Sequence, residues 1–494
     1  MGTSLQALLA GLPDGPVVPA EAVARLAAAS DRVLVVLDDD PTGTQSVADL
    51  PVLLDRSRGS LEWALCQGRP AVYVLTNSRS LGPEEAAERN REVARNAFAA
   101  AATVGVRVDF VSRSDSTLRG HFPLETDVLG EEIRTGTGAP VDGVVLVPAF
   151  GDAGRITVGS VHYASAEGGY TPAGQTEFAR DATFGYRSSD LREWVEEKTA
   201  GRVRAADVAR IDLTTLRTDH AGTVAVLRSL SKARPVVVDI VGENDLRLLA
   251  LALYEAERAG SRLLYRVGPP FVRALIGQEP RPPLDVAELT VIRRGGPAEG
   301  APGGLIVVGS HVALTTTQLR HLVERTAPTE LEIDVPVVLD GAAGSAATLA
   351  ALVAGVADAA AAALATGNVV VRTSRLLISG SDAADSLAVS RRVSTAVVDV
   401  VREILRRTAP RFVVAKGGIT SSDVAARGLG IERAMVRGPL LPGIVSLWEP
   451  VDGPARGVPY VVFAGNVGGP TSLADVVEKL SSGPDRPRPG SLPA

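Results

Sequence analysis

The sequence predicts an α/β fold of two domains, each with a mainly parallel sheet, and an active site in the interdomain cleft. First, the chain has 494 residues, which is enough for two or three ordinary domains. Second, short β-branched runs alternate with longer amphipathic stretches, as buried parallel strands alternate with covering helices. Third, this alternation stops once and then restarts, which indicates two domains whose cleft is the default ligand site.

The first domain is predicted at residues 1–276. Its helices include Pro83–Ala100, which opens with a proline and has acidic residues in its first turn, as helix starts often do. Its strands are predicted from short, mainly apolar runs at Val33–Leu37, Val72–Leu75, Val106–Val111, Val144–Val147 and Val236–Ile240.

Residues 277–304 are rich in Pro and Gly, which disfavours regular elements and predicts an interdomain linker or a long surface loop. The second domain is predicted at 305–480, with helices at Thr316–Arg325 and Ser386–Arg407. The tail, 481–494, is expected to be disordered. The strands of this domain are predicted at Leu305–Val308, Val369–Val371, Leu376–Ile378, Phe412–Ala415 and Tyr460–Phe463.

The 51 basic and 57 acidic residues give a net charge of −6, so no global attraction to nucleic acid or to an anionic membrane is expected. The single cysteine, Cys66, cannot form an intramolecular disulfide and favours a reducing compartment. No basic export signal opens the chain, and the Ala-rich stretch Ala350–Ala365 is interrupted by Asp358, as in a helix of a soluble protein. We therefore expect a cytoplasmic protein.

Polar residues follow the first predicted strand directly, at Asp38–Gln45. Ligands of open α/β sheets bind at the carboxyl ends of strands, so this loop is well placed for function. Adjacent carboxylates repel one another unless a cation or donors compensate, and such a cluster binds Mg²⁺, accepts a proton or holds substrate hydroxyls. The alternative is an Asx-type turn before a helix. We favour a functional role for Asp39, Asp40 and Thr42.

A second polar segment, Ser112–His121, follows another predicted strand. Arginine binds carboxylate through a bidentate fork, while acidic and hydroxyl side chains bind hydroxyls, so the segment suits a hydroxylated acid. A helix N-cap at Ser114 or Asp115 is the alternative, and both readings are compatible because a cap also forms an anion site. The glycine-rich loop Gly151–Gly159 is as consistent with a structural role as with ligand binding. The candidate residues of these two segments are Arg113, Asp115, Ser116, Arg119, Arg155 and His162.

In the second half, the strand Phe412–Ala415 leads into paired glycines, hydroxyl residues and a helix expected to begin near Ser422. Backbone N–H groups at a helix start bind phosphate, and glycines let the phosphate come close. The alternative is an ordinary βα turn with Ser as the N-cap. Weaker glycine loops follow other strands at Gly309–His311 and Ala464–Pro470. The candidate phosphate-binding residues are Lys416, Gly417, Gly418, Ile419, Thr420 and Ser421.

Several known motifs are absent from the chain. No Gly-Lys-Ser/Thr occurs, so the phosphate loop is not a Walker A motif. No GxGxxG follows the first strand, which disfavours a dinucleotide site. No GxSxG elbow occurs, and one cysteine cannot supply a zinc site with paired cysteines.

Taken in order, seven segments resemble the four-carbon acid sugar kinase family, and the resemblance covers most of the chain, roughly from Val33 to Val477. One segment alone is weak support, whereas seven in the same order are specific. The chain departs from the family at Ala464, where many relatives carry Pro, and by extra sequence around 170–205 and 277–304. The segments are DDPTG at Asp39–Gly43, SDSTLRG at Ser114–Gly120, AGRITVGSVHY at Ala153–Tyr163, FARDATFGYRSSDLREWVEEKT at Phe178–Thr199, VVGSH at Val307–His311, AKGGITSSDVA at Ala415–Ala425 and FAGNVGGP at Phe463–Pro470.

The resemblance implies an N-terminal domain that binds a sugar acid and a C-terminal domain that binds ATP. The implied reaction is ATP-dependent phosphorylation of a terminal hydroxyl of a short sugar acid such as threonate, erythronate or an oxo-tetronate. The implied sugar-acid contacts are Asp39, Arg113, Asp115, Arg119 and His162, and the implied nucleotide contacts are Ser310, Gly417–Ser421, Gly465 and Asn466.

In the mechanism expected from these assignments, Mg²⁺ bridges the ATP phosphates, which Lys416 and the glycine loop hold. Arg113 or Arg119 pairs with the substrate carboxylate, and either Asp39 or Asp115 accepts the proton of the attacking hydroxyl, with Asp39 preferred. The alternatives are a non-catalytic sugar-acid sensor and an NAD(P)-dependent sugar-acid oxidoreductase. No nucleic-acid or membrane partner is expected, and a homodimer is one expectation for the oligomeric state.

Overall fold

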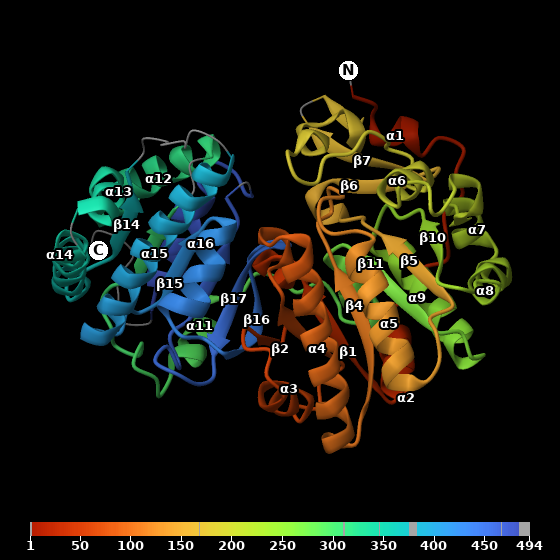
Figure 1. Ribbon diagram of the computed structural model, residues 1–494, viewed down its shortest axis with the longest axis horizontal. Helices are drawn as coiled ribbons and strands as arrows, with labels where there is room; N and C mark the ends of the chain where they lie inside the picture. The colour runs from red at the N-terminus through yellow and green to blue at the C-terminus, as the bar shows by residue number, and fades with distance from the viewer. Residues whose placement is uncertain are drawn as a thin grey trace, which may run out of the picture. The chain divides into compact units, whose positions relative to one another are not determined.

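The computed structural model describes residues 2–166, 168–309, 312–344, 346–374, 383–465 and 467–483. The chain folds into two compact units, Met1–Pro280 (unit 1) and Arg281–Ala494 (unit 2), which are described separately (Figure 1). The predicted strand Leu376–Ile378 lies outside the described residues, as does the predicted tail from residue 484 onward. Ser481, predicted to open that tail, is the last residue of a helix instead.

Unit 1 is built on a parallel sheet, as predicted. Every neighbouring pair of strands in this sheet is parallel. Because both faces of such a sheet are covered by helices, its strands are continuous apolar runs, and every residue of the first strand is buried. The strands, in spatial order, are β2 (Leu50–Leu53), β3 (Ala71–Leu75), β1 (Arg32–Asp38), β4 (Arg107–Arg113), β11 (Leu263–Val267), β5 (Gly143–Val147), β10 (Arg234–Val238) and β9 (Ala209–Ile211).

Helices cover the two faces of this sheet. Alternate side chains of β1, at Val33, Val35 and Leu37, pack against Val93 and Ala97 in the core beneath one helical layer. That layer contains α3 (Arg58–Leu65), α4 (Pro83–Val104) and α5 (Leu124–Thr137), which lie side by side (Figure 1). The other helices are α1 (Leu5–Leu8), α2 (Ala20–Ala29), α6 (Leu191–Lys198), α7 (Leu213–Thr218), α8 (His220–Arg228), α9 (Glu243–Arg258) and α10 (Pro270–Leu275).

A small antiparallel sheet, which the sequence did not predict, is inserted after β5. It consists of β6 (Arg155–Val158), β7 (Val161–Ala166) and β8 (Gly169–Pro172). A separate hydrophobic cluster joins Leu118 and Leu146 to Trp194 of α6. This cluster packs α6, which follows the insertion, against β5 and the segment after β4.

Unit 2 has a mixed sheet that is mainly parallel. In spatial order, the strands are β13 (Thr329–Ile333), β14 (Val369–Thr373), β12 (Leu305–Val308), β15 (Val413–Lys416), β18 (Tyr460–Phe463), β17 (Ile444–Pro450) and β16 (Arg433–Leu441). Strands β16 and β17 form an antiparallel hairpin that the sequence did not predict, and β17 also pairs antiparallel with β18. The pairs among β12, β13, β14, β15 and β18 are parallel. The helices are α11 (Val286–Arg293), α12 (Ala313–Thr326), α13 (Val335–Gly344), α14 (Ala346–Leu364), α15 (Ala383–Arg407), α16 (Gly418–Asp423) and α17 (Ser472–Ser481).

The segment 277–304 contains a helix, so the prediction that it has no regular elements is wrong. Helix α11 lies inside it and begins with a capping box between Asp285 and Glu288. Leu284 and Leu289 are buried in the core of unit 2. The Pro and Gly residues flank the helix, and they conceal a helix of two turns from a prediction based on composition.

Helix α14 is the one helix among the described residues that is long and apolar enough to cross a membrane, judged by length and composition only. Its buried residues are Val353, Ala357, Ala360 and Leu364, which recur every three or four positions and form one stripe. The helix packs against α13, α15, β13 and β14. It is therefore a covering helix of the unit 2 sheet, with an Ala-rich outer face.

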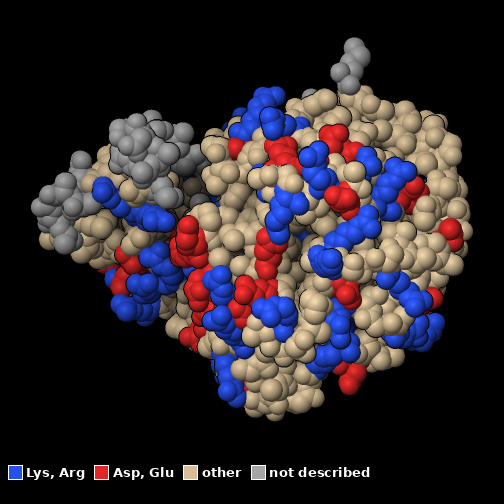
Figure 2. All heavy atoms as spheres, turned by 45° about the vertical axis from the view of Figure 1, so that its right-hand side comes forward, with Lys and Arg blue, Asp and Glu red and all other residues tan. Residues whose placement is uncertain are grey.

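Charges are mixed on the molecular surface. Basic and acidic side chains are interspersed over the face shown in Figure 2. Several form exposed pairs, such as Arg202 with Asp127 at 2.6 Å. Exposed pairs of this kind contribute only about 0–1 kcal/mol each, so the buried cores provide most of the stability.

The two units share one strand order. In unit 1 the chain fills β1, then β2 and β3 on one side, and then crosses to β4 on the other side. In unit 2 the strands β12, β13, β14 and β15 repeat this order. Ligands of open α/β sheets bind where the strand order reverses, outside the carboxyl ends of the strands. The fold therefore points to the ends of β1 and β4 in unit 1, and of β12 and β15 in unit 2.

Candidate functional site

The ends of β1 and β4 are joined by a buried ion pair. Asp38 and Arg113 are the last residues of these strands and lie in register. The Arg113 guanidinium contacts the Asp38 carboxylate, lies 3.2 Å from Asp39 Oδ1 and donates a hydrogen bond to the Asp40 carbonyl at 2.5 Å. Arg113 therefore neutralises acids of the protein itself. Its predicted contact with a substrate carboxylate stays a prediction.

Asp40 and Thr42 fit the turn that we weighed as the alternative. Asp40 is the N-cap of the 3₁₀ helix η1 (Pro41–Ser46). Its Oδ1 accepts hydrogen bonds from the Thr42 backbone N–H at 2.9 Å and from the Thr42 hydroxyl at 2.5 Å. Since Asp38 pairs with Arg113 and Asp40 caps the turn, Asp39 is the member of the acidic run that is left for chemistry.

Arg79, which the sequence analysis missed, gathers three acids. One terminal nitrogen lies 3.3 Å from Asp39 Oδ1 and 3.2 Å from Asp40 Oδ2, and the other lies 3.6 Å from Asp115 Oδ1. Arg79 belongs to the polar run Asn77–Ser80, which follows β3. The rule that located the acidic loop, polar residues directly after a strand, would have located this run as well.

Asp39 has the features of a proton acceptor. It is 1% exposed, and its Oδ2 has no hydrogen-bond partner. Burial raises the pKa of Asp39 to about 7, against the opposing effect of the Arg79 guanidinium. A carboxylate suits general base catalysis when its pKa lies near neutral pH and one of its oxygens has no other hydrogen-bond partner.

Asp115 has the opposite electrostatic character. Burial raises the pKa of Asp115, but Arg79 and Arg119 more than compensate, so the pKa lies well below its usual range. Arg119 Nε donates to Asp115 Oδ2 at 2.7 Å, and the Thr117 hydroxyl donates to the same oxygen. Asp115 is therefore a permanent anion, suited to orienting donors. This contrast supports the preference for Asp39 as the base.

Two arginines lie close to one aromatic ring. The guanidinium carbons of Arg119 and Arg155 lie 5.4 and 5.7 Å from the centre of the Phe178 ring. Arg155 Nε is buried and has no hydrogen-bond partner. Arg119 is paired with Asp115, as Arg113 is with Asp38, so a contact of Arg119 or Arg155 with a substrate carboxylate stays a prediction.

His162 has a structural role. Its Nε2 lies 2.8 Å from the Ser116 carbonyl, which can only accept, so Nε2 carries the proton and donates. Its Nδ1 then accepts from the Thr157 hydroxyl at 3.0 Å. Burial lowers the pKa of His162 to about 4, which keeps the ring neutral. The histidine fixes Ser116 through its backbone, and the predicted substrate contact of either residue stays a prediction.

A second buried ion pair, which the sequence did not predict, lies beside the acid–arginine cluster. Arg266 of β11 pairs with Glu125 and donates to the Ser112 hydroxyl at 2.7 Å. Gly120 allows a close approach here. Its φ is +125°, and an added Cβ would lie 2.9 Å from Arg266 Nη2 and 3.1 Å from Asp39 Oδ2. These two atoms therefore both lie where a side chain at position 120 would begin.

In unit 2, the ends of β12 and β15 lie against each other. Gly309 follows β12, and an added Cβ there would lie 2.3 Å from the Thr420 hydroxyl oxygen, so only glycine fits. Helix α16 begins at Gly418, four residues earlier than the sequence predicted, after Gly417 with φ +128°. The Ser421 hydroxyl donates to the carbonyls of Ala415 in β15, at 2.8 Å, and of Gly417, at 2.5 Å. Ser310, Asn466 and the side chain of Ile419 lie outside the described residues.

Lys416, a candidate phosphate-binding residue, is fully buried. Its ammonium donates to the Ala464 carbonyl at 2.6 Å and lies 3.9 Å from the centre of the Phe463 ring. Burial lowers the pKa of Lys416 to about 7. In this arrangement Lys416 positions the loop that follows β18, and its direct contact with a phosphate stays a prediction.

The loop after β18 has its carbonyls turned toward the protein. Besides Ala464, the Gly465 carbonyl accepts from Thr315 at 3.0 Å, and Gln318 donates to Val467 at 3.1 Å and to residue 469 at 2.8 Å. In a trans peptide the C=O and the next N–H point in opposite directions. The N–H groups of Gly465 and residue 468 therefore point away from these partners, as an anion-binding loop requires.

Within the described ranges, no group of three or more His, Cys, Asp or Glu side chains is arranged to hold a metal ion. The geometry thus offers a buried acid–arginine cluster in unit 1 and an amide-lined loop in unit 2.

Comparison with known proteins gives both units a counterpart. A family model described as a sugar-binding N-terminal domain matches residues 34–275, and one described as a nucleotide-binding C-terminal domain matches residues 305–473. Two solved structures share the fold. A Salmonella typhimurium LT2 protein, provisionally named a tRNA synthase, is 17% identical with a TM-score of 0.64, over 90% of this chain and 98% of its own. A Haemophilus influenzae protein is 15% identical with a TM-score of 0.59, over 90% and 99%.

Two curated relatives carry kinase names. A D-erythronate kinase from Heliobacterium modesticaldum is 27% identical over 275 residues, so the match spans 54% of this chain and only about half, 54%, of that relative. A D-threonate kinase from Cupriavidus necator is 26% identical over 383 residues, which are 76% of this chain and 79% of the relative. Together with the two domain models, these matches confirm the resemblance seen in the seven ordered segments. The chain belongs to the four-carbon acid sugar kinase family.

Proposed function

We propose that this protein is an ATP-dependent kinase that phosphorylates a terminal hydroxyl of a short sugar acid, with four carbons and of the erythronate or threonate type. The observation that carries the proposal is the free, buried Oδ2 of Asp39 at the end of β1, beside a cluster of arginines. The curated relatives, which are a D-erythronate kinase and a D-threonate kinase, support the substrate class. A cytoplasmic location and a homodimer stay predictions.

In this proposal, Asp39 accepts the proton of the attacking hydroxyl through Oδ2. Arg119 and Arg155 bind the substrate carboxylate, because both guanidinium groups lie at the Phe178 ring. Asp115 stays ionised and orients a substrate hydroxyl, and Arg79 keeps the three acids together. Phosphoryl transfer depends on such positioning and charge neutralisation more than on covalent chemistry.

Unit 2 binds the nucleotide in this proposal. The N–H groups of Gly465 and Gly468 hold phosphate oxygens, with the glycines at Gly417 and Gly418 nearby in the second loop. Mg²⁺ arrives with ATP and supplies charge neutralisation at the phosphates. No protein ligand set for the metal occurs in the described part of the chain, so no step is assigned to one.

The test is ADP release with a panel of three- to six-carbon sugar acids. We expect Mg²⁺- and ATP-dependent turnover that is highest with a four-carbon acid. Thermal unfolding with each ligand separates the alternatives, because a ligand that binds only the native state raises Tm. A sensor is stabilised by sugar acids and releases no ADP, and an oxidoreductase is stabilised by NAD⁺ or NADP⁺. Either of these results would overturn the kinase proposal.

Lys416→Met tests the positioning of the nucleotide loop. Methionine fills the buried space but leaves the Ala464 carbonyl without its donor, a loss of about 1.5–3 kcal/mol for a charged hydrogen bond. We expect KM for ATP to rise roughly tenfold or more, with KM for the sugar acid unchanged.

The matched control for this variant is Lys479→Met. Lys479 also donates to a backbone carbonyl of unit 2, that of Leu440 at 3.2 Å, but lies on α17. We expect unchanged KM for ATP in this control. Equal effects of the two substitutions would show that Lys416 acts on stability alone.

A further inference from the structure

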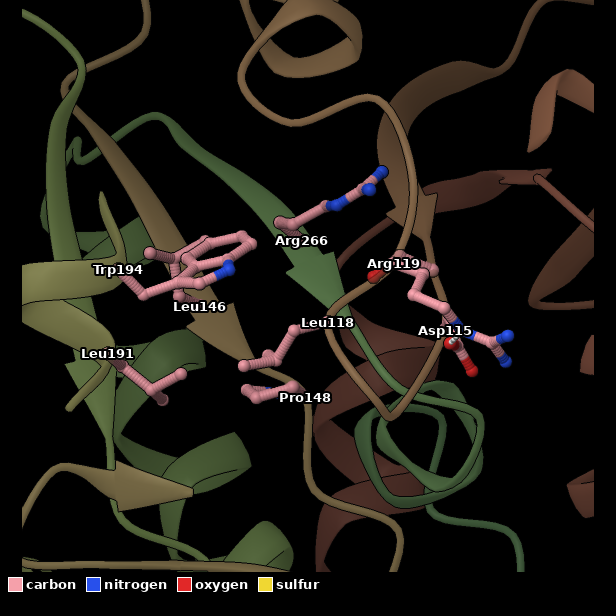
Figure 3. A pocket seen from close by; sticks show the side chains of 9 residues that line it. Asp115, Leu118, Arg119, Leu146, Pro148, Leu191, Trp194 and Arg266 are labelled. Carbon is pink, nitrogen blue, oxygen red and sulfur yellow. Dashed lines mark hydrogen bonds and ion pairs between the residues drawn. The ribbon is translucent and has the colours of Figure 1, made fainter. Parts of the chain in front are cut away.

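A small cavity lies beside the acid–arginine cluster of unit 1. Its volume is about 20 Å³, enough for one water-sized group. Figure 3 shows Leu118, Leu146, Leu191 and Trp194 around it, with Arg266 on a further side. None of the proposed catalytic steps uses this cavity.

Trp194, which lines this cavity, has an unsatisfied hydrogen-bond donor. The residue is 4% exposed, and its Nε1 is buried without a hydrogen-bond partner. The edge that carries the indole nitrogen lies on the side facing Leu118 and Arg266 (Figure 3). An indole N–H can only donate, and a buried donor without an acceptor is destabilising. The cavity therefore calls for an acceptor oxygen, which a methyl or methylene group cannot supply.

The indole is held rigidly in this orientation. Its ring stacks on Phe122 with centroids 4.7 Å apart and planes at 23°. Leu191 and Trp194 both lie on α6, whose first turn is fixed because Asp190 caps it through the Arg192 N–H at 2.8 Å. A donor fixed in this way selects its acceptor by position as well as by chemistry.

The cavity is continuous with the residues proposed to bind the sugar acid. Asp115 and Arg119 line it, as does Arg266. Arg266 Nη2 and Asp39 Oδ2 lie close together, because an added Cβ at Gly120 would be 2.9 Å from the first atom and 3.1 Å from the second. A short ligand that reaches Asp39 with one hydroxyl is thus bordered by the cavity on another side.

We propose that this cavity is an oxygen subsite, in which a hydroxyl or keto oxygen of the sugar acid accepts a hydrogen bond from Trp194 Nε1–H. The inference rests on the proposed function and deepens it by naming a residue that determines substrate choice. The volume of about 20 Å³ suits one small polar group, so the subsite favours short acids with an oxygen at that position. A resident water molecule is the competing occupant.

Trp194→Phe tests the subsite, because it removes the N–H and keeps an aromatic ring to stack on Phe122. We expect KM for the preferred four-carbon acid to rise about tenfold while kcat changes less than twofold. The wild type should lose about the same factor with the deoxy analogue that lacks the bound oxygen. The variant should lose nothing further with that analogue, since the shared hydrogen bond is already gone.

Tryptophan fluorescence gives a readout that does not depend on turnover. Titration of the wild type with the sugar acid should shift the emission, and the shift should disappear in Trp194→Phe. Trp63→Phe is the matched control, because Trp63 packs at the other core of unit 1. Its KM and its fluorescence response should stay as in the wild type.

Two outcomes would overturn the subsite. If KM and the response to the deoxy analogue are the same in Trp194→Phe and in the wild type, the cavity holds a water molecule only. If the emission of the wild type does not respond to any sugar acid that raises Tm, the acid binds without reaching Trp194. Failure of the proposed function has a different signature, because a wild type without ADP release can still show the Trp194-dependent fluorescence response.

Discussion

Asp39→Asn is expected to lower kcat about 10³-fold while leaving the fold intact. General base catalysis contributes typically 10²–10⁴-fold, and asparagine cannot accept the proton. Asparagine resembles the neutral carboxyl group that burial already favours at this position. Steady-state ADP release measures the loss, and a thermal shift with the sugar acid checks that binding survives.

The pH dependence sharpens this prediction. The pKa of Asp39 is raised to about 7, so the group binds a proton as the pH falls through 7 and the base is lost. In the wild type, kcat/KM should fall about tenfold per pH unit below that point. The residual activity of Asp39→Asn should lack this limb.

The contribution of Asp39 to stability should change in the opposite direction to kcat/KM, because it grows as the pH falls. A carboxyl group with a raised native pKa favours the folded state below its unfolded pKa of roughly 4, and this contribution is lost as the pH rises through about 7. Asp39→Asn is free of this loss, so its Tm at pH 8 should equal or exceed that of the wild type. Near-normal turnover in a stable Asp39→Asn would exclude Asp39 as the base.

Arg79→Met is expected to impair both turnover and stability. The substitution leaves Asp39, Asp40 and Asp115 without their shared cation, and removing one partner of a buried ion pair costs about 3–5 kcal/mol. An opposite charge at this distance lowers a carboxyl pKa by about 1–3 units, so its loss should move the acidic limb of kcat/KM to higher pH by that amount. Thermal unfolding and a pH–rate profile measure the two effects.

The direction of the pH effect on stability follows from the same charges. The three carboxylates repel one another only while ionised, so the Tm deficit of Arg79→Met should shrink as the pH falls. Arg79→Lys retains the charge and should restore most of the pH profile. Arg25→Met, at an exposed helix pair with Glu21, should leave both properties unchanged. An acidic limb at the wild-type pH in Arg79→Met would contradict the role given to Arg79.

The sequence predicts the residues of the site that adjoin strands. Asp39, Asp115 and Lys416 each lie within four residues of the end of a predicted strand, so the rule that ligands bind at strand ends locates them. Asp39 was preferred to Asp115 as the base, but no observation in the sequence separates the two acids. The distinction depends on the partners that burial and folding supply, an orphaned oxygen for one and two arginines for the other.

Other parts of the site depend on tertiary contacts that carry no local signal. Strand β11 was missed, and its buried Arg266 is paired with Glu125, which is remote in the sequence. Trp194 looks like an ordinary helix residue until Phe122 and Leu146 surround it. Strand β13 was missed because it is an edge strand that exposes Glu330 on its outer face.

The glycine-rich loop after β18 has a consequence for binding thermodynamics. Its carbonyls are already held by Lys416, Thr315 and Gln318, so the directions of its amides are set when unit 2 folds. Glycines are the residues that lose the most backbone entropy on ordering. Here that entropy is lost during folding, so a phosphate group bound as proposed would meet a preorganised surface and would order little further chain.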